Sequence, residues 1–202
     1  MVIVYLRRLK ILENPKEDRR IRRTKRLLKQ GLALMMAEKE FKDITVKDIT
    51  EKVDLNRSTF YLHYTDTYDL LEKLENDTLR DFQNMIEAYS TTDGSQSLRP
   101  MFEAIADYVL ENSDTCRIMF ENKASGNFFV KFETLIERNG TVIIQNRIPG
   151  ISQKNLEYYF AFITYGAIGI LKQWFNEDMK AEKDAVVDFA NNIVETAAKV
   201  LK

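Results

Sequence analysis

The stretch that decides the fold runs from residue 45 to residue 64 and reads TVKDITEKVDLNRSTFYLHY. Thr45 can cap a helix by accepting a hydrogen bond from the backbone N–H of Asp48, whose charge suits the positive end of the helix. Apolar residues then recur at spacings of three and four along one face: Val46, Ile49 and Val53. The pattern predicts a short helix over 45–52.

The second half of this stretch predicts another short helix over 56–62. Asp54 and Leu55 make a tight turn, and Asn56 is a favourable N-cap residue. Phe60 and Tyr64 are expected to turn inward as anchors. The polar side chains left outside are short enough to reach base edges or phosphate oxygens: Arg57, Ser58, Thr59, Tyr61 and His63.

Two helices of this length bury too little area to be stable alone, so their neighbours must supply a core. The preceding helix, predicted over 19–38, offers apolar residues: Leu27, Leu28, Leu34 and Met35. The following helix, over 66–90, is capped by Asp66 with Asp69. The arrangement is that of a helix-turn-helix, whose second helix enters the major groove. The alternative is a helical hairpin that merely has a polar face.

The sequence here resembles the TetR family of bacterial transcriptional regulators, over about residues 19–74. The likeness follows the order Thr45-Val46-x-Asp48-Ile49-x-x-x-Val53-x-Leu55-Asn56-Arg57-Ser58-Thr59-Phe60-Tyr61-x-His63-Tyr64-x-Asp66-x-Tyr68-Asp69-Leu70-Leu71, with Thr24, Leu28 and Phe41 before it. The resemblance implies an all-α fold of about nine helices. It also implies an N-terminal three-helix DNA-binding domain and a C-terminal helical domain for ligand binding and dimerisation.

The resemblance implies which residues meet double-stranded DNA. The tyrosine at position 61 and the residue at position 67 grip phosphates in such proteins, and the first helix and the N-caps add backbone contacts. The expected DNA-binding set is Arg22, Arg23, Arg26, Thr45, Lys47, Asn56, Arg57, Ser58, Thr59, Tyr61, His63 and Thr67. Three positions depart from the family pattern: Asp54 and Ser58 replace common glycines, and Thr67 replaces a common lysine. Asp54 either strains the turn or serves in place of glycine.

His63 is the single histidine of the chain. With no cysteine or second histidine nearby, no metal site is expected. The ring is predicted to lie at the groove edge or a phosphate, or else to make a structural hydrogen bond.

The basic side chains at 19–26 cannot all face the phosphates, because a helix spreads its side chains around its circumference. Arg22, Arg23 and Arg26 are expected to matter most.

Charge supports this division of the chain. The first 65 residues hold 16 Lys and Arg against 9 Asp and Glu, and the remainder holds 14 against 22. A basic N-terminal third joined to an acidic remainder suggests a polyanionic partner for the N-terminal third alone.

No stretch of about 18 residues is apolar and uncharged, so no membrane segment is expected. The single cysteine, Cys116, fits a reducing, cytoplasmic setting.

Three parts are predicted along the chain: an N-terminal extension (1–18), a DNA-binding domain (19–74) and a regulatory and dimerisation domain (75–202). The extension is a basic arm, an extra helix, or residues encoded upstream of the true start. Beyond residue 90, helices are expected at 98–111, 114–121, 127–140, 153–175 and 182–201. The β-branched run Thr141 to Ile144 is interpreted as a helix end or a loop.

The C-terminal region shows no phosphate loop, paired-carboxylate pattern or nucleophile elbow, so no enzymatic activity and no cofactor are expected. Residues 158–174 are apolar nearly all round, which predicts burial on more than one side, and Gly166 and Gly169 suggest a close helix approach. This region resembles, more loosely, the C-terminal domain of many Firmicutes members. The expected dimer interface is Ile163, Ala167, Ile170, Trp174, Phe189, Ile193 and Ala197.

A set of aromatic and apolar residues either lines an effector pocket or forms plain core: Phe82, Met85, Phe102, Ile105, Tyr108, Phe120, Phe132, Tyr159, Phe162 and Tyr165. The resemblance implies a repressor that binds a near-palindromic operator as a homodimer and is released by a small-molecule effector. One alternative is a DNA-binding co-regulator controlled by a protein partner, with no small-molecule pocket. A remote one is an enzyme whose DNA-binding region is vestigial.

Overall fold

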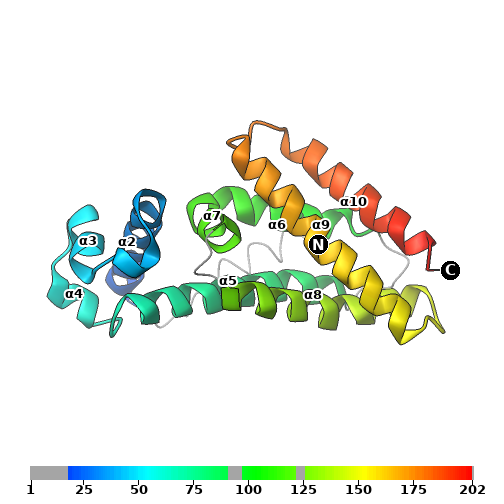
Figure 1. Cartoon of the computed structure of the whole chain (residues 1–202), viewed down its shortest axis with the longest axis horizontal. Coiled ribbons are helices and arrows are strands. Elements are labelled where there is room, and N and C mark those ends of the chain that lie inside the picture. The colour runs from blue at the N-terminus through cyan, green and yellow to red at the C-terminus, as the bar shows by residue number, and fades with distance from the viewer. Residues whose placement is uncertain (1–17, 91–96, 122–125, 202) are drawn as a thin grey trace. The chain divides into compact units, whose positions relative to one another are not determined.

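The computed structural model describes residues 18–90, 97–121 and 126–201. Within these ranges the chain forms nine α-helices and one 3-10 turn and contains no β-strand, which confirms the all-α prediction. The elements are α2 (Arg19–Glu38), η1 (Phe41–Asp43), α3 (Val46–Lys52), α4 (Arg57–Tyr61), α5 (Thr67–Ser90), α6 (Arg99–Glu111), α7 (Ser113–Glu121), α8 (Gly126–Arg147), α9 (Gln153–Asn176) and α10 (Lys183–Lys199) (Figure 1). Residues 1–17 of the predicted extension lie outside the described residues.

The chain divides into two compact units, residues up to Leu74 and residues from Glu75 onward. We call them unit 1 and unit 2. Helix α5 contributes its first turns to unit 1 and its remainder to unit 2.

Unit 1 is built around the crossing of α2 and α3. Its fully buried side chains come from every helix of the unit: Leu28, Leu32, Ile49, Phe60 and Leu70. Gly31 allows the close approach, because a Cβ there would lie 2.8 Å from the backbone oxygen of Ile49. Leu34 was predicted to join this core, but its side chain is exposed, because it points to the opposite face of α2.

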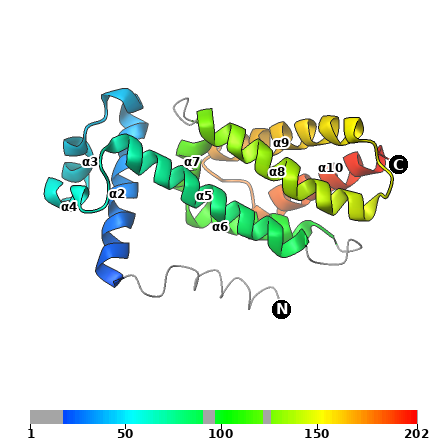
Figure 2. The same ribbon diagram turned by 90° about the horizontal axis from the view of Figure 1, so that it is seen from below.

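Unit 2 packs α9 against α7, α8 and α10, and α6 against α7 and α10 (Figure 2). Aromatic rings fill one part of its interior, where Phe82, Phe120, Phe128 and Phe132 lie 5.3–6.2 Å apart by ring centroids. Arg99 joins α6 to α10 by donating to Asp188 Oδ1 at 2.7 Å. The unit is therefore held by an apolar interior and by ion pairs at its edge.

Helix α8 is longer than the sequence predicts. It runs without a break through Thr141–Ile144 and ends at Arg147, two residues before Pro149. The interpretation of this run as a loop or helix end was wrong. Ile143 and Ile144 are buried against neighbouring helices, and that burial outweighs the weak helix propensity of β-branched residues.

Among the described helices, none combines the length and the apolar character that a membrane crossing would require.

Candidate nucleic-acid interface

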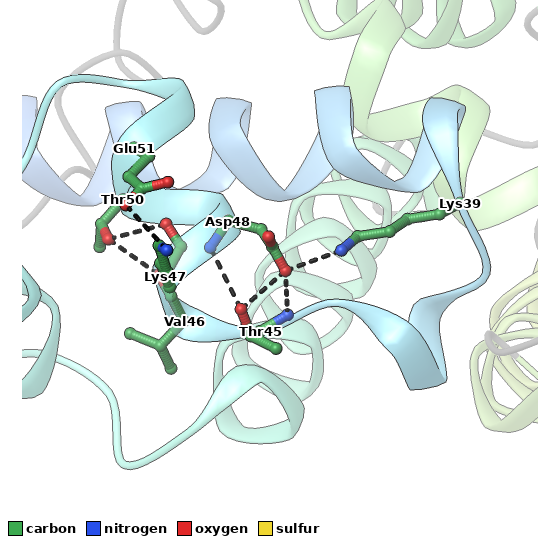
Figure 3. Close-up of polar contacts among 7 residues, drawn as sticks. All are labelled: Lys39, Thr45, Val46, Lys47, Asp48, Thr50 and Glu51. Atoms are coloured by element: carbon green, nitrogen blue, oxygen red, sulfur yellow. Dashed lines mark hydrogen bonds and ion pairs between the residues drawn. The ribbon is translucent and has the colours of Figure 1, made fainter.

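The start of α3 is fixed by a reciprocal cap (Figure 3). The Thr45 hydroxyl accepts from the backbone N–H of Asp48 at 3.2 Å, and Asp48 Oδ2 accepts from the backbone N–H of Thr45 at 2.8 Å. Lys39, which follows α2 directly, donates to the same Asp48 oxygen at 2.7 Å. The hydrogen bond from Lys39, followed by those from Thr45, holds the pKa of Asp48 well below its ordinary value. The predicted cap is confirmed, and it ties α3 to the end of α2.

The turn between α3 and α4 uses a left-handed residue. Asp54 has φ 53°, a conformation that suits glycine and that aspartate tolerates. The backbone N–H of Leu55 donates to Thr50 O at 2.9 Å, which closes the turn. Asn56 stands at the N-cap position of α4 as predicted, but its side chain makes no capping hydrogen bond.

Helix α4 presents two different faces. Phe60 is fully buried and Tyr64, just after the helix, is nearly so, with ring centroids 5.6 Å apart. Tyr61 is 59% exposed, and Arg57 and Ser58 are also exposed. The predicted anchors are therefore inside, and a polar row lies outside.

The start of α5 holds α4 in place through a second cap. Asp69 Oδ2 accepts from the backbone N–H of Thr65 at 2.9 Å, and Asp66 Oδ1 accepts from the backbone N–H of Asp69 at 2.8 Å. Lys73 pairs with Asp69 at 2.9 Å and lies 5.2 Å above the centre of the Tyr64 ring. The hydrogen bond from Lys73 lowers the pKa of Asp69.

Most of the residues predicted to contact DNA lie at the surface of unit 1. Exposed members are Arg23, Arg26, Thr45, Lys47, Asn56, Arg57, Ser58 and Tyr61, and half-buried members are Arg22, Thr59 and His63. Thr67 is the exception, because its side chain is only 8% exposed at the start of α5. Assigning that side chain to DNA contact needs correction: threonine is too short to reach past its neighbours, unlike the lysine common in the family.

Sequence reasoning missed the two lysines that brace this surface. Lys39 and Asp48 are nine residues apart and separated by η1, and Lys73 reaches back to Tyr64 and, at 3.4 Å, to the carbonyl oxygen of His63. Neither spacing is a helical one, so no periodic pattern signals these contacts. In the part of the chain that the structure describes, no three His, Cys, Asp or Glu side chains gather as metal ligands would.

Unit 2 contains a cavity of about 140 Å³, walled by α5, α6, α8, α9 and α10. Half of the predicted effector-pocket residues line it: Phe82, Phe102, Ile105, Phe132 and Tyr159. Met85 and Phe120 are buried outside its walls, and Tyr108 donates its hydroxyl hydrogen to Asp81 at 3.1 Å. Phe162 and Tyr165 are 60% and 66% exposed, so their predicted place in the pocket needs correction.

Apart from Tyr159, the residues of α9 assigned to the pocket and to the dimer interface lie on the faces opposite to those predicted. Four residues assigned to the dimer interface line the cavity instead: Ile163, Ala167, Ile170 and Trp174. Ile193 and Ala197 of α10 are half-buried, and Ala197 packs against the cluster around Leu156 and Phe160. The outward surface holds exposed aromatic side chains of both helices: Tyr158, Phe162, Tyr165 and Phe189. A helix that is apolar all round has no polar side to indicate which face turns inward.

A helix-turn-helix unit joined to a second helical unit is an arrangement of transcriptional regulators. Residues 96–196, half of the chain, match a TetR-type family model described as "Transcriptional regulator C-terminal region". The chain therefore belongs to the TetR family of transcriptional regulators. This membership assigns it to a class of regulators and not to a class of enzymes.

One curated relative is an uncharacterized HTH-type transcriptional regulator, YxbF of Bacillus subtilis (strain 168), 23% identical over 163 residues. The match covers 79% of this chain and 41% of the relative, so the chain spans about two fifths of that relative's length.

Solved structures of TetR-like regulators share the fold. The fatty acid degradation regulator FadR from Bacillus halodurans is 13% identical, with a TM-score of 0.67, over 89% of this chain and 96% of that one. A TetR transcriptional regulator from Streptococcus agalactiae 2603V is 20% identical, with a TM-score of 0.58, over 88% and 96%. The dihydroxyacetone kinase operon activator DhaS is 16% identical, with a TM-score of 0.59, over 89% and 98%.

Proposed function

We propose that this TetR-family regulator binds a near-palindromic operator as a homodimer, with α4 in the major groove. It represses transcription in the cytoplasm until a small molecule occupies the cavity of unit 2. DNA binding is supported by the two faces of α4, because Phe60 is buried and Tyr61 and Arg57 are exposed. The helices before and after α4 are each fixed by a cap at their start. A rigidly held helix presents its polar side chains to base edges without the cost of ordering its backbone on binding.

Dimerisation is supported by the outward face of α9 and α10. Tyr158, Phe162, Tyr165 and Phe189 are each more than half exposed, and large apolar patches mark interaction surfaces. A Cβ built at Gly166 or Gly169 meets nothing within 4 Å, so a partner helix has room to approach the backbone there. Two copies also double the base contacts available to a short recognition helix.

Regulation by a small molecule is supported by the cavity. Phe82 and Ile86 of α5 form part of its wall, and the same helix supplies the first turns that belong to unit 1. A ligand there contacts a helix shared with the DNA-binding unit. The cavity speaks against the alternative of a co-regulator that has no pocket and answers only to a protein partner.

Selection of bound duplexes from a random library tests DNA binding by the full chain. Two half-sites related by two-fold symmetry are expected, with centres about 34 to 36 Å apart. Arg57→Ala and Tyr61→Ala should each lower affinity for the selected duplex at least about tenfold. Lys42→Ala is the matched control, because its amine lies in η1 and pairs with Glu40 at 2.7 Å. Equal binding of random duplexes, or an equal loss in the control, would contradict the assignment.

A reporter placed behind the selected operator tests the sign of regulation. Deleting the gene for this protein should raise expression from that promoter. One structure of the same fold is named an operon activator, so a fall in expression would assign activation to this chain instead.

A further inference from the structure

The cavity of unit 2 offers a ligand almost no polar partner. Among the described residues that line it there is no Asp, Glu, Lys, Arg or His. Only two lining side chains carry nitrogen or oxygen, Tyr159 and Trp174. The Tyr159 hydroxyl donates to the backbone oxygen of Val194 at 3.3 Å, and Trp174 Nε1 donates to that of Ala181 at 3.1 Å. Both donors are therefore already used within the protein.

The two charged groups that act on Tyr159 do not line the cavity. Arg147 and Glu195 pair with each other at 2.9 Å, and neither lines the wall. Burial, followed by the charge of Glu195, raises the pKa of the Tyr159 phenol, so this side chain stays neutral near pH 7. A carboxylate or ammonium group placed inside would lose its water and gain no partner, which is strongly unfavourable.

The size of the cavity limits the ligand further. Its volume of about 140 Å³ is close to that of an engineered apolar cavity of about 150 Å³, which stays dry and binds benzene or xenon. Small residues open the space: Ala106 on α6, Ala167 on α9 and Ala190 on α10. Lengthening any of these side chains would fill the volume from one wall.

We infer that this cavity binds an uncharged, largely hydrocarbon molecule about as large as one substituted aromatic ring. The inference rests on the proposed function, because it names the chemical class of the effector at that same site.

Toluene and benzoate provide a matched pair of probes, since they share the ring and differ in charge. Thermal unfolding of the full chain is followed with each probe present in excess. Toluene at about ten times its dissociation constant should raise the melting temperature by about 3 °C, and benzoate at the same concentration should leave it unchanged. Ala190→Leu, which fills the cavity from α10, should lose most of the response to toluene.

Two further measurements keep the result independent of any one variant. Ala106→Leu fills the same space from α6, and Ala37→Leu makes the same change at an exposed position of α2 and should respond like the wild type. In the wild type, nuclear Overhauser contacts should join the toluene ring to the methyl groups of Ile105 and Val194. No shift with toluene, an equal shift with benzoate, or an undiminished shift in both filled variants would overturn the inference.

Operator binding is measured on the same samples without a probe. If toluene binds and no operator is selected, the cavity inference stands and the proposed function fails. If an operator is selected and toluene does not bind, the inference fails and the DNA-binding assignment stands.

Discussion

Lys39 Nζ lies 2.7 Å from Asp48 Oδ2, on the same oxygen that accepts the backbone N–H of Thr45 (Figure 3). One carboxylate thus joins the end of α2, the loop before α3 and the first turn of α3. The orientation of the helix-turn-helix depends on this junction, which gives the first prediction.

Asp48→Asn should lower the stability of unit 1 by about 1 kcal/mol at pH 7, because it weakens a cap and an ion pair together. The folded-state pKa of Asp48 lies below its ordinary value of 3.8, so the carboxylate stabilises the fold above that pH. Its contribution is lost as the pH falls through the folded-state pKa. Urea unfolding at pH 7, 5 and 3.5 should show a difference between wild type and variant that shrinks only below about pH 4.

Asp43→Asn, which changes an exposed carboxylate in η1, is the control and should leave the urea midpoint unchanged. A difference between wild type and Asp48→Asn that is absent at pH 7, or that grows as the pH falls from 7 to 3.5, would contradict a stabilising carboxylate.

Replacements of Asp54 should rank in the order glycine, aspartate, alanine for stability. The φ of 53° places this residue in the left-handed region, where a Cβ is unfavourable and aspartate is tolerated better than alanine. Asp54→Gly should gain about 0.5 kcal/mol and Asp54→Ala should lose about 1 kcal/mol. Urea midpoints measure both changes, and equal midpoints for the two variants would contradict this account of the turn.

Phe162→Glu should weaken self-association at least about tenfold, because it places an unpaired charge in the proposed apolar interface. Sedimentation equilibrium over a range of concentrations measures the change. Val130→Glu alters a side chain on α8 that is 64% exposed and should leave association unchanged. A wild type that is monomeric at micromolar concentrations would remove this surface from consideration as a dimer interface.

Cys116 should resist alkylation in the native protein. The thiol is fully buried, and burial, followed by the nearby charge of Asp81, raises its pKa to about 12. Because the folded-state pKa lies above the ordinary value of 9.0, this group stabilises the fold below pH 9 and less so above it. Iodoacetamide at pH 8 should react far more slowly with the native protein than with the protein in urea, because only the small unfolded population exposes the thiol. Equal rates with and without urea would contradict the burial.

The sequence predicted unit 1 better than it predicted unit 2. Caps act over three or four residues, so Thr45 with Asp48 and Asp66 with Asp69 mark their helices directly. The bracing by Lys39 and Lys73 depends on how helices cross, and no local pattern carries that information.

In unit 2 the sequence predicted where the helices lie, but it did not predict which of their faces are buried. Between residues 158 and 174, α9 is apolar on every side, so spacing alone gave no reason to turn Ile163 inward and Phe162 outward. The extent of α8 was missed for a related reason. The β-branched run at 141–144 is a weak helix former by itself, and the burial of Ile143 and Ile144 becomes visible only in the fold.

The contact between Gly140 and Phe160 limits how unit 2 can rearrange. A Cβ at position 140 would overlap the Phe160 ring, so that ring lies directly on the backbone of α8. Sliding α8 along α9 by about one turn would bring Ile136 or Ile144, which lie on the same face of the helix as Gly140, against the ring, and both carry side chains. The two helices are therefore expected to keep a single axial register and to move as a pair. If the cavity widens for an incoming molecule, the helices that move are therefore expected to be its other walls, α5, α6 and α10.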